Sequence, residues 1–179
     1  RIPWSPGVGG VWTPGIPGTT TRTPDGGSIY WDPDPPSLDQ IPINCIGCTD
    51  EECKDVKRVL KNVGVPKNVP CITIRCDGVG LPAGEKCAGG GINPSTGCGE
   101  IVLAPGVATS IGDAGTCGTI DSGPCGPGPD GPADVPACLI AHEAGHIICG
   151  NDTSQQCANQ QMNQNAKKTC PNVHCHDYP

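Results

Sequence analysis

Fourteen cysteines in a chain of 179 residues constrain the fold more than any other feature of this sequence. A high and even cysteine number is typical of small domains held together by disulfides in an oxidising compartment. Burial of apolar side chains is a weak alternative source of stability, because Phe is absent while Gly and Pro number 27 and 21. We therefore expect one disulfide-rich domain with paired cysteines, and we expect the protein to be secreted and extracellular.

The first 44 residues contain no cysteine and are rich in Pro and Gly. This composition disfavours a regular helix or a central strand and predicts polyproline-like chain and turns. A short unit recurs in it, as Trp4-Ser5-Pro6-Gly7-Val8 and Trp12-Thr13-Pro14-Gly15-Ile16. We interpret residues 1–44 as a Pro/Gly/Trp-rich arm or linker and residues 45–179 as the disulfide-stapled domain. The tryptophans either belong to a solvated tether or dock on this body or on a neighbouring copy through self-association.

The charge pattern disfavours two classes of partner. The formal net charge is −7, and the sequence predicts no face rich in Lys and Arg. Nucleic acids and anionic membranes are bound through such faces, so neither is expected as a partner. No stretch of the chain approaches the roughly 18 apolar residues of a membrane span.

Within the domain, capping and periodicity signals predict an α+β fold with a short sheet and about three helices. Thr49 and Glu52 have the spacing of a capping box, and Asp134 is placed as the N-cap of a second helix. The predicted helices run from Thr49 to Gly64, from Asp134 to Gly150, and from Thr153 to about Lys168, and the predicted strands are Cys71–Cys76 and Glu100–Ala104. Residues 105–132 are expected to form a structured loop near the functional site, pinned by Cys117 and Cys125.

An HExxH sequence, His142-Glu143-Ala144-Gly145-His146, lies within the second predicted helix. Residues four apart lie on the same face of a helix, so both imidazoles can bind one Zn²⁺ at about 2.0–2.1 Å. Glu143, one position further round the helix, is expected beside the open position of the metal. Zinc at such a site lowers the pKa of its bound water and polarises a carbonyl group, and Glu143 is the candidate general base.

With a strand and a loop before this helix, residues 100–152 resemble the zincin metallopeptidases. The resemblance implies a small zincin-like domain, a zinc cofactor, and hydrolysis of peptide bonds in a peptide or protein substrate. It also implies that the strand Glu100–Ala104 lies at the rim of the sheet, antiparallel to the bound peptide. A cysteine-rich unit of this kind is consistent with a toxin or effector domain released from a larger secreted protein.

The third metal ligand has three alternatives. No Glu follows Glu143, so the arrangement of the gluzincins is missing, and the third predicted helix carries Gln side chains instead. Asp152 stands ten residues after His142, and the resemblance to metzincins, which place their third ligand at this offset, makes Asp152 the first candidate. His174 and His176 are the second, because a cysteine-pinned tail could fold back on the body. A site without a third protein ligand is the remaining alternative.

A non-catalytic function is the alternative to a peptidase. In that case the protein is an extracellular structural or adhesive subunit, its Trp-Pro-Gly arm docks into a neighbouring copy, and its HExxH helix holds a structural metal or is vestigial. Thiolate ligands are not expected, because paired cysteines have no thiolate to offer. We expect Cys138 and Cys149 to form disulfides that clamp the active helix, and Cys45-x2-Cys48 to be structural cystine.

Overall fold

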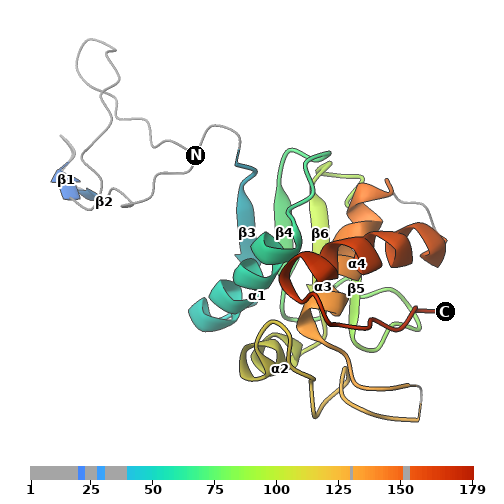
Figure 1. Cartoon of the computed structure of the whole chain (residues 1–179). Helices are drawn as coiled ribbons and strands as arrows, with labels where there is room; N and C mark the ends of the chain where they lie inside the picture. The colour runs from blue at the N-terminus through green and yellow to red at the C-terminus, as the bar shows by residue number, and fades with distance from the viewer. Residues whose placement is uncertain (1–19, 23–27, 31–39, 130, 151–153) are drawn as a thin grey trace. The chain divides into compact units, whose positions relative to one another are not determined.

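A computed structural model describes residues 20–22, 28–30, 40–129, 131–150 and 154–179 (Figure 1). The chain divides into two compact units, Arg1–Pro42 and Ile43–Pro179. The second unit begins two residues before the predicted boundary, because strand β3 (Ile43–Ile46) already pairs with the rest of the body. Both copies of the Trp-Pro-Gly sequence lie outside the described residues.

The first unit contains a short hairpin in its described part. Strands β1 (Thr20–Arg22) and β2 (Ser28–Tyr30) pair antiparallel, with Thr20 opposite Tyr30. The Pro/Gly-rich composition predicts polyproline-like chain and turns in this region, and the hairpin is a local exception to that prediction. Its residues Thr20–Arg22 include two β-branched side chains and no Pro or Gly, which permits a regular ladder.

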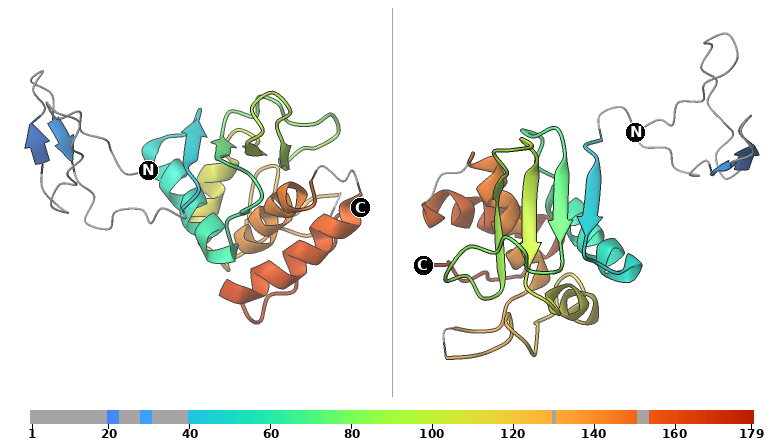
Figure 2. Two further views of the ribbon diagram at one scale, coloured as in Figure 1. Left: turned by 90° about the horizontal axis from the view of Figure 1, so that it is seen from above. Right: turned by 180° about the vertical axis from the view of Figure 1, so that it is seen from behind.

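The second unit is a four-stranded mixed sheet with its helices packed on one face, which confirms the α+β class (Figure 2). The spatial order of the strands is β3-β4-β6-β5, with β4 at Ile72–Arg75, β5 at Ala88–Ile92 and β6 at Gly99–Leu103. Strands β3, β4 and β6 are parallel to one another, and β5 pairs antiparallel with β6 at one edge. The core lies between the sheet and the helices and is built from Ile, Val, Leu and Ala side chains.

The first helix of the body forms where its capping signals predicted it. Helix α1 (Asp50–Val63) begins at a capping box, in which the Thr49 hydroxyl accepts from the Glu52 backbone N–H and the Glu52 carboxylate accepts from the Thr49 N–H. The helix ends at Gly64, whose φ of 115° favours glycine. Its apolar side chains Val56, Val59, Leu60 and Val63 are buried in the core and almost fully inaccessible.

The predicted strand Glu100–Ala104 exists as β6, but its predicted position at the rim of the sheet is wrong. Strand β6 is hydrogen-bonded to β4 on one side and to β5 on the other, and most of its side chains are buried. The rim position belongs to β5, which the sequence analysis missed. The run Gly89-Gly90-Gly91 carries no side-chain periodicity, so it reads as a loop although its backbone pairs as a strand.

The expected loop over residues 105–132 contains a helix that the sequence analysis also missed. Helix α2 (Val107–Ala114) follows Gly106. It has no side-chain cap and no acidic residue in its first turn, so the usual sequence signals for a helix start are missing. Its buried side chains Val107, Ala108 and Ile111 attach it to the core. As expected, disulfides pin the rest of this region at Cys117 and Cys125.

The two C-terminal helices are confirmed with changes at their starts. Helix α3 (Pro136–Ile148) has Pro136 in its first turn and Val135, rather than Asp134, as its N-cap. Asp134 instead turns to the C-terminal tail. Helix α4 (Gln155–Thr169) begins after Ser154, and the predicted capping box at Thr153 lies outside the described residues. With α1 and α2, these make four helices in the described part of the body, where about three were expected.

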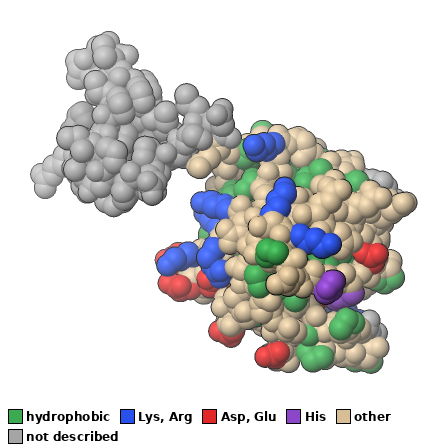
Figure 3. All heavy atoms as spheres, viewed as in Figure 1, with side chains coloured by type: hydrophobic (Ala, Val, Ile, Leu, Met, Phe, Trp, Pro, Cys, Tyr) green, Lys and Arg blue, Asp and Glu red, His purple; other side chains and the backbone are tan. Residues whose placement is uncertain are grey.

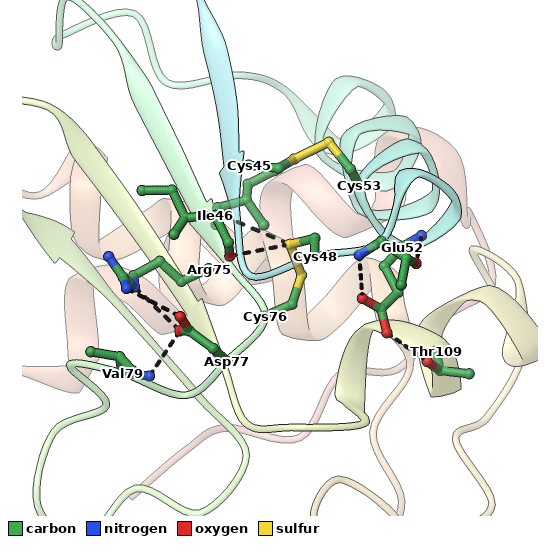
Figure 4. Close-up of a disulfide and its surroundings, with 12 residues drawn as sticks. Cys45, Ile46, Cys48, Glu52, Cys53, Arg75, Cys76, Asp77, Val79 and Thr109 are labelled. Atoms are coloured by element: carbon green, nitrogen blue, oxygen red, sulfur yellow. Dashed lines mark hydrogen bonds and ion pairs between the residues drawn. A yellow bond between two sulfur atoms is a disulfide. The ribbon is translucent and has the colours of Figure 1, made fainter.

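All fourteen cysteines are described, and all are paired. The seven disulfides are Cys45–Cys53, Cys48–Cys76, Cys71–Cys98, Cys87–Cys125, Cys117–Cys170, Cys138–Cys175 and Cys149–Cys157. The predictions for the cysteines of α3 and for the Cys45-x2-Cys48 spacing are therefore confirmed. Figure 4 shows how the two cysteines of that spacing tie β3 to different partners, one in α1 and one at the end of β4. These cross-links indicate an oxidising environment.

The surface of α1 carries a basic group that the sequence analysis did not anticipate. Lys54, Lys57, Arg58 and Lys61 line one shallow depression on this helix. Figure 3 shows Lys and Arg side chains gathered on this face of the body. The group is partly neutralised, because Arg58 pairs with Asp55 at 3.4 Å. Among the helices that the structure describes, none has the length and apolar character needed to cross a bilayer.

Candidate metal centre

The HExxH sequence lies in the interior of the body, because α3 is buried on nearly all sides. The helix contacts β5 and β6 of the sheet, and it contacts α1 and α4 within the helical layer. His142 and Glu143 are only 2% and 4% exposed. A buried polar pair of this kind needs partners or a function, since desolvating it without compensation is costly.

Two glycines allow this close packing around the motif. Gly90 of β5 faces the backbone of α3 so closely that an added Cβ would lie 2.3 Å from the carbonyl oxygen of Glu143. On the other side of α3, a Cβ on Gly145 would lie 3.0 Å from the backbone of Ala158 in α4. The absence of these side chains brings a strand and a second helix to the two histidines.

The two imidazoles converge as the helical spacing predicts. Their Nε2 atoms lie 3.2 Å apart, and the rings meet edge to face with centroids 4.8 Å apart. Two ligands of a tetrahedral zinc ion with bonds of about 2.0–2.1 Å are separated by about 3.3 Å. The observed spacing of the nitrogens therefore fits a shared zinc ion.

The electrostatic state of His142 also suits a ligand. Burial lowers its pKa to about 4, with the charge of His146 as a second cause, and contacts with Gln155 and Asn159 act in the opposite direction. The imidazole is thus neutral at physiological pH, which is the form that binds metals. Its Nδ1 atom is buried and has no hydrogen-bond partner within the described parts of the chain.

Glu143 and the two histidines line one pocket. Burial, together with the negative charges of Glu85 and Asp134, raises the pKa of this carboxyl to about 8. A carboxyl group with a pKa near neutrality can both accept and return a proton, which is the requirement for a general acid or base.

The pocket over these residues has a volume of about 500 Å³. Its walls come from the loop after β4, from the edge strand β5, from α3, from the start of α4, and from the C-terminal tail. A cavity of this size accepts a few side chains of a peptide. Edge strand β5 and the two histidines thus line the same pocket.

Neither His174 nor His176, two of the predicted third ligands, joins the paired imidazoles. Asp152 lies outside the described residues. His174 is exposed, and His176 has its Nε2 atom 3.5 Å from Asp134. Among the described residues, no third His, Cys, Asp or Glu places a ligand atom within 4.8 Å of both imidazoles.

The tail nevertheless folds back on the body, as the second alternative required. The disulfide Cys138–Cys175 ties it to α3, and the residue that it brings to the site is Tyr178. The ring of Tyr178 lies 4.3 Å from that of His142, and its hydroxyl donates to the buried carboxylate of Asp134. Burial raises the pKa of Asp134, while the Tyr178 hydroxyl and the charge of His176 act against this rise.

Sequence reasoning missed two residues of this site, Tyr178 and Gln155. The Oε1 atom of Gln155 lies 3.0 Å from Nε2 of His142. The sequence signal for Gln155 was its position in the helix after the motif, where the absence of Glu was noted. Tyr178 carried only a weak signal, as the sole aromatic residue outside the first 31.

A second group of potential ligand atoms consists of Cys87, Cys125 and Asp134. Its two sulfur atoms are joined in a disulfide, so neither is a thiolate. Because only the thiolate binds zinc well, this group is better described as a cystine that packs against the Asp134 carboxylate.

Comparisons with known proteins identify no relative of this chain. No protein-family model matches the chain, and no curated protein or solved structure shows significant similarity to it. The site itself consists of two facing imidazoles and a buried carboxyl that line one pocket.

Proposed function

We propose that the body is a secreted, zinc-dependent metallopeptidase. The observation that carries this proposal is the 3.2 Å approach of the His142 and His146 Nε2 atoms at the floor of an open pocket. Both nitrogens would hold the ion. When bound at such a site, zinc polarises the scissile carbonyl group and lowers the pKa of a water molecule.

The remaining chemistry is assigned to Glu143. Its carboxylate accepts the proton of the attacking water and returns it to the leaving amine. The pKa of about 8 for this group supports the role, since its two protonation states are close in free energy at neutral pH.

Strand β5 is the element that would hold an extended substrate. It lies at an edge of the sheet, and Ala88, Gly89 and Gly90 line the pocket. Exposed edge strands bind peptides by main-chain hydrogen bonds. The zincin resemblance implied this role for the strand at Glu100–Ala104, and the position of β5 transfers the proposal to residues 88–92.

The test separates metal binding from hydrolysis. Elemental analysis of the purified protein should give about one zinc per chain, and a fluorogenic peptide library should be cleaved in a chelator-sensitive manner. Glu143→Gln should keep the zinc and lose cleavage, whereas the exposed Glu51→Gln should change neither. Zinc binding without any peptide cleavage would favour the non-catalytic alternative, a structural subunit with a structural metal.

A further inference from the structure

We propose that Gln155 is the third protein ligand of the metal, bound through its side-chain oxygen. The inference deepens the proposed function and rests on its zinc site at His142 and His146. It assigns a ligand that is neither an acidic residue nor a third histidine.

The first argument is that two potential metal-binding atoms flank Nε2 of His142. Nε2 of His142 has Nε2 of His146 at 3.2 Å and Oε1 of Gln155 at 3.0 Å. Both distances are close to the separation of about 3.3 Å between ligands of a tetrahedral zinc ion. Amide and carboxylate oxygens present the same type of donor atom to a metal, and zinc accepts oxygen ligands at about 2.0–2.2 Å.

The second argument is a count of protons. A neutral imidazole carries one N–H group, so Nε2 of His142 either donates or accepts, but does not do both. If Nε2 of His142 carries the hydrogen, it donates to Oε1 of Gln155; if it carries the lone pair, two acceptor atoms face each other at 3.0 Å. A cation bound by both atoms satisfies both lone pairs.

The third argument is the rigidity of the support. Gln155 is the first residue of α4, and the disulfide Cys149–Cys157 ties the start of α4 to the end of α3. Gly145 lets the backbone of Ala158 approach α3 closely. The Gln155 side chain lines the pocket from this fixed position, as a preorganised ligand requires.

The chemical consequence is a site without an anionic ligand. Two neutral imidazoles and a neutral amide leave the charge of a dication uncompensated by its ligands. Such a site binds zinc more weakly than one with a carboxylate ligand, so Gln155→Glu should tighten binding. This expectation distinguishes a ligand from a residue that only hydrogen-bonds to His142.

The experiment measures metal affinity on the full chain with its disulfides intact. Zinc is titrated in competition with a chromophoric chelator, and Co²⁺ is used as a probe of coordination through its visible absorption. The variants are Gln155→Ala and Gln155→Glu, with the exposed neighbour Gln156→Ala as the matched control. Thermal unfolding of the metal-free variants checks that each is folded, and Asp152→Ala tests the rival ligand.

We expect Gln155→Ala to weaken zinc binding by at least about tenfold and to change the Co²⁺ spectrum. Gln155→Glu should restore or exceed the affinity of the parent protein, and Gln156→Ala should match the parent. Equal zinc affinities for Gln155→Ala and Gln156→Ala would overturn the inference, as would a loss of zinc binding confined to Asp152→Ala.

The same data separate this inference from the proposed function. If the parent protein binds no zinc, both fail. If zinc binding depends on Gln155 but no peptide is cleaved, the ligand assignment stands and the peptidase proposal fails. If zinc is bound and peptides are cleaved independently of Gln155, only the ligand assignment fails.

Discussion

The phenol ring of Tyr178 covers the imidazole of His142, with the two ring centroids 4.3 Å apart. This contact places the C-terminal tail in the wall of the pocket, although the two residues are far apart in the sequence. The Tyr178 backbone is held in turn by Asn159 of α4, which accepts from its N–H at 3.1 Å and donates to its carbonyl at 2.9 Å. The tail is therefore part of the site.

Tyr178→Phe should destabilise the protein while leaving the ring against His142. The variant removes the hydroxyl that donates to Asp134, whose side chain is buried at 6% exposure. Loss of a hydrogen bond to a buried carboxylate costs about 1–3 kcal/mol. Denaturant unfolding with intact disulfides measures this loss. In a double-mutant cycle with Asp134→Ala, the two effects should not be additive, and additivity would contradict the proposed coupling.

Glu143 should make the metal-free protein less stable as the pH rises. Its pKa is about 8 in the folded state, against an ordinary value of 4.5, so the unfolded chain releases this proton first. The free energy of unfolding should therefore fall between about pH 4.5 and 8, by on the order of 3–5 kcal/mol. Chelator-treated protein is compared with Glu143→Gln at each pH, and parallel curves for the two proteins would refute the prediction.

His142 should act in the opposite direction on the acid side. Its folded-state pKa of about 4 lies below the ordinary 6.5, so the unfolded chain binds a proton first as the pH falls. This contribution to stability is complete above pH 6.5 and is lost toward pH 4, by about 3 kcal/mol. Because Glu143 titrates in an overlapping range with the opposite sign, the effect is read as the difference between the metal-free parent and His142→Gln. A difference that is constant with pH would show that His142 is not buried as a neutral group.

Gly90→Ala should destabilise the body and disturb the site. The new Cβ would meet the Glu143 carbonyl oxygen at 2.3 Å, and neither backbone can move without separating β5 from α3. Overpacking of this kind costs about 1–3 kcal/mol. Thermal unfolding and zinc affinity are measured together, with Gly128→Ala as the control because its Cβ would meet nothing within 4 Å. Equal behaviour of the two variants would show that β5 tolerates displacement from the motif.

Local sequence signals predicted those helices and strands that carry a clear cap or a clear periodicity. The capping box at Thr49 and the alternating residues between Cys71 and Cys76 each predicted an element that the structure contains. Local signals failed where these features are missing, because the glycine run of β5 has no periodicity and α2 has no side-chain cap. Strand β6 was predicted correctly as a strand but was placed at the wrong position, since its hydrogen-bond neighbours are set by distant segments.

By itself, the sequence determined that the cysteines form disulfides and that His142 and His146 lie side by side on one helix. Both follow from short-range facts, namely cysteine number and the four-residue period of a helix. Only the tertiary structure decided which cysteines pair, which strand forms the rim of the pocket, and that Gln155 and Tyr178 reach His142. These contacts join segments that are distant along the chain, and their free energies depend on packing that no local pattern encodes.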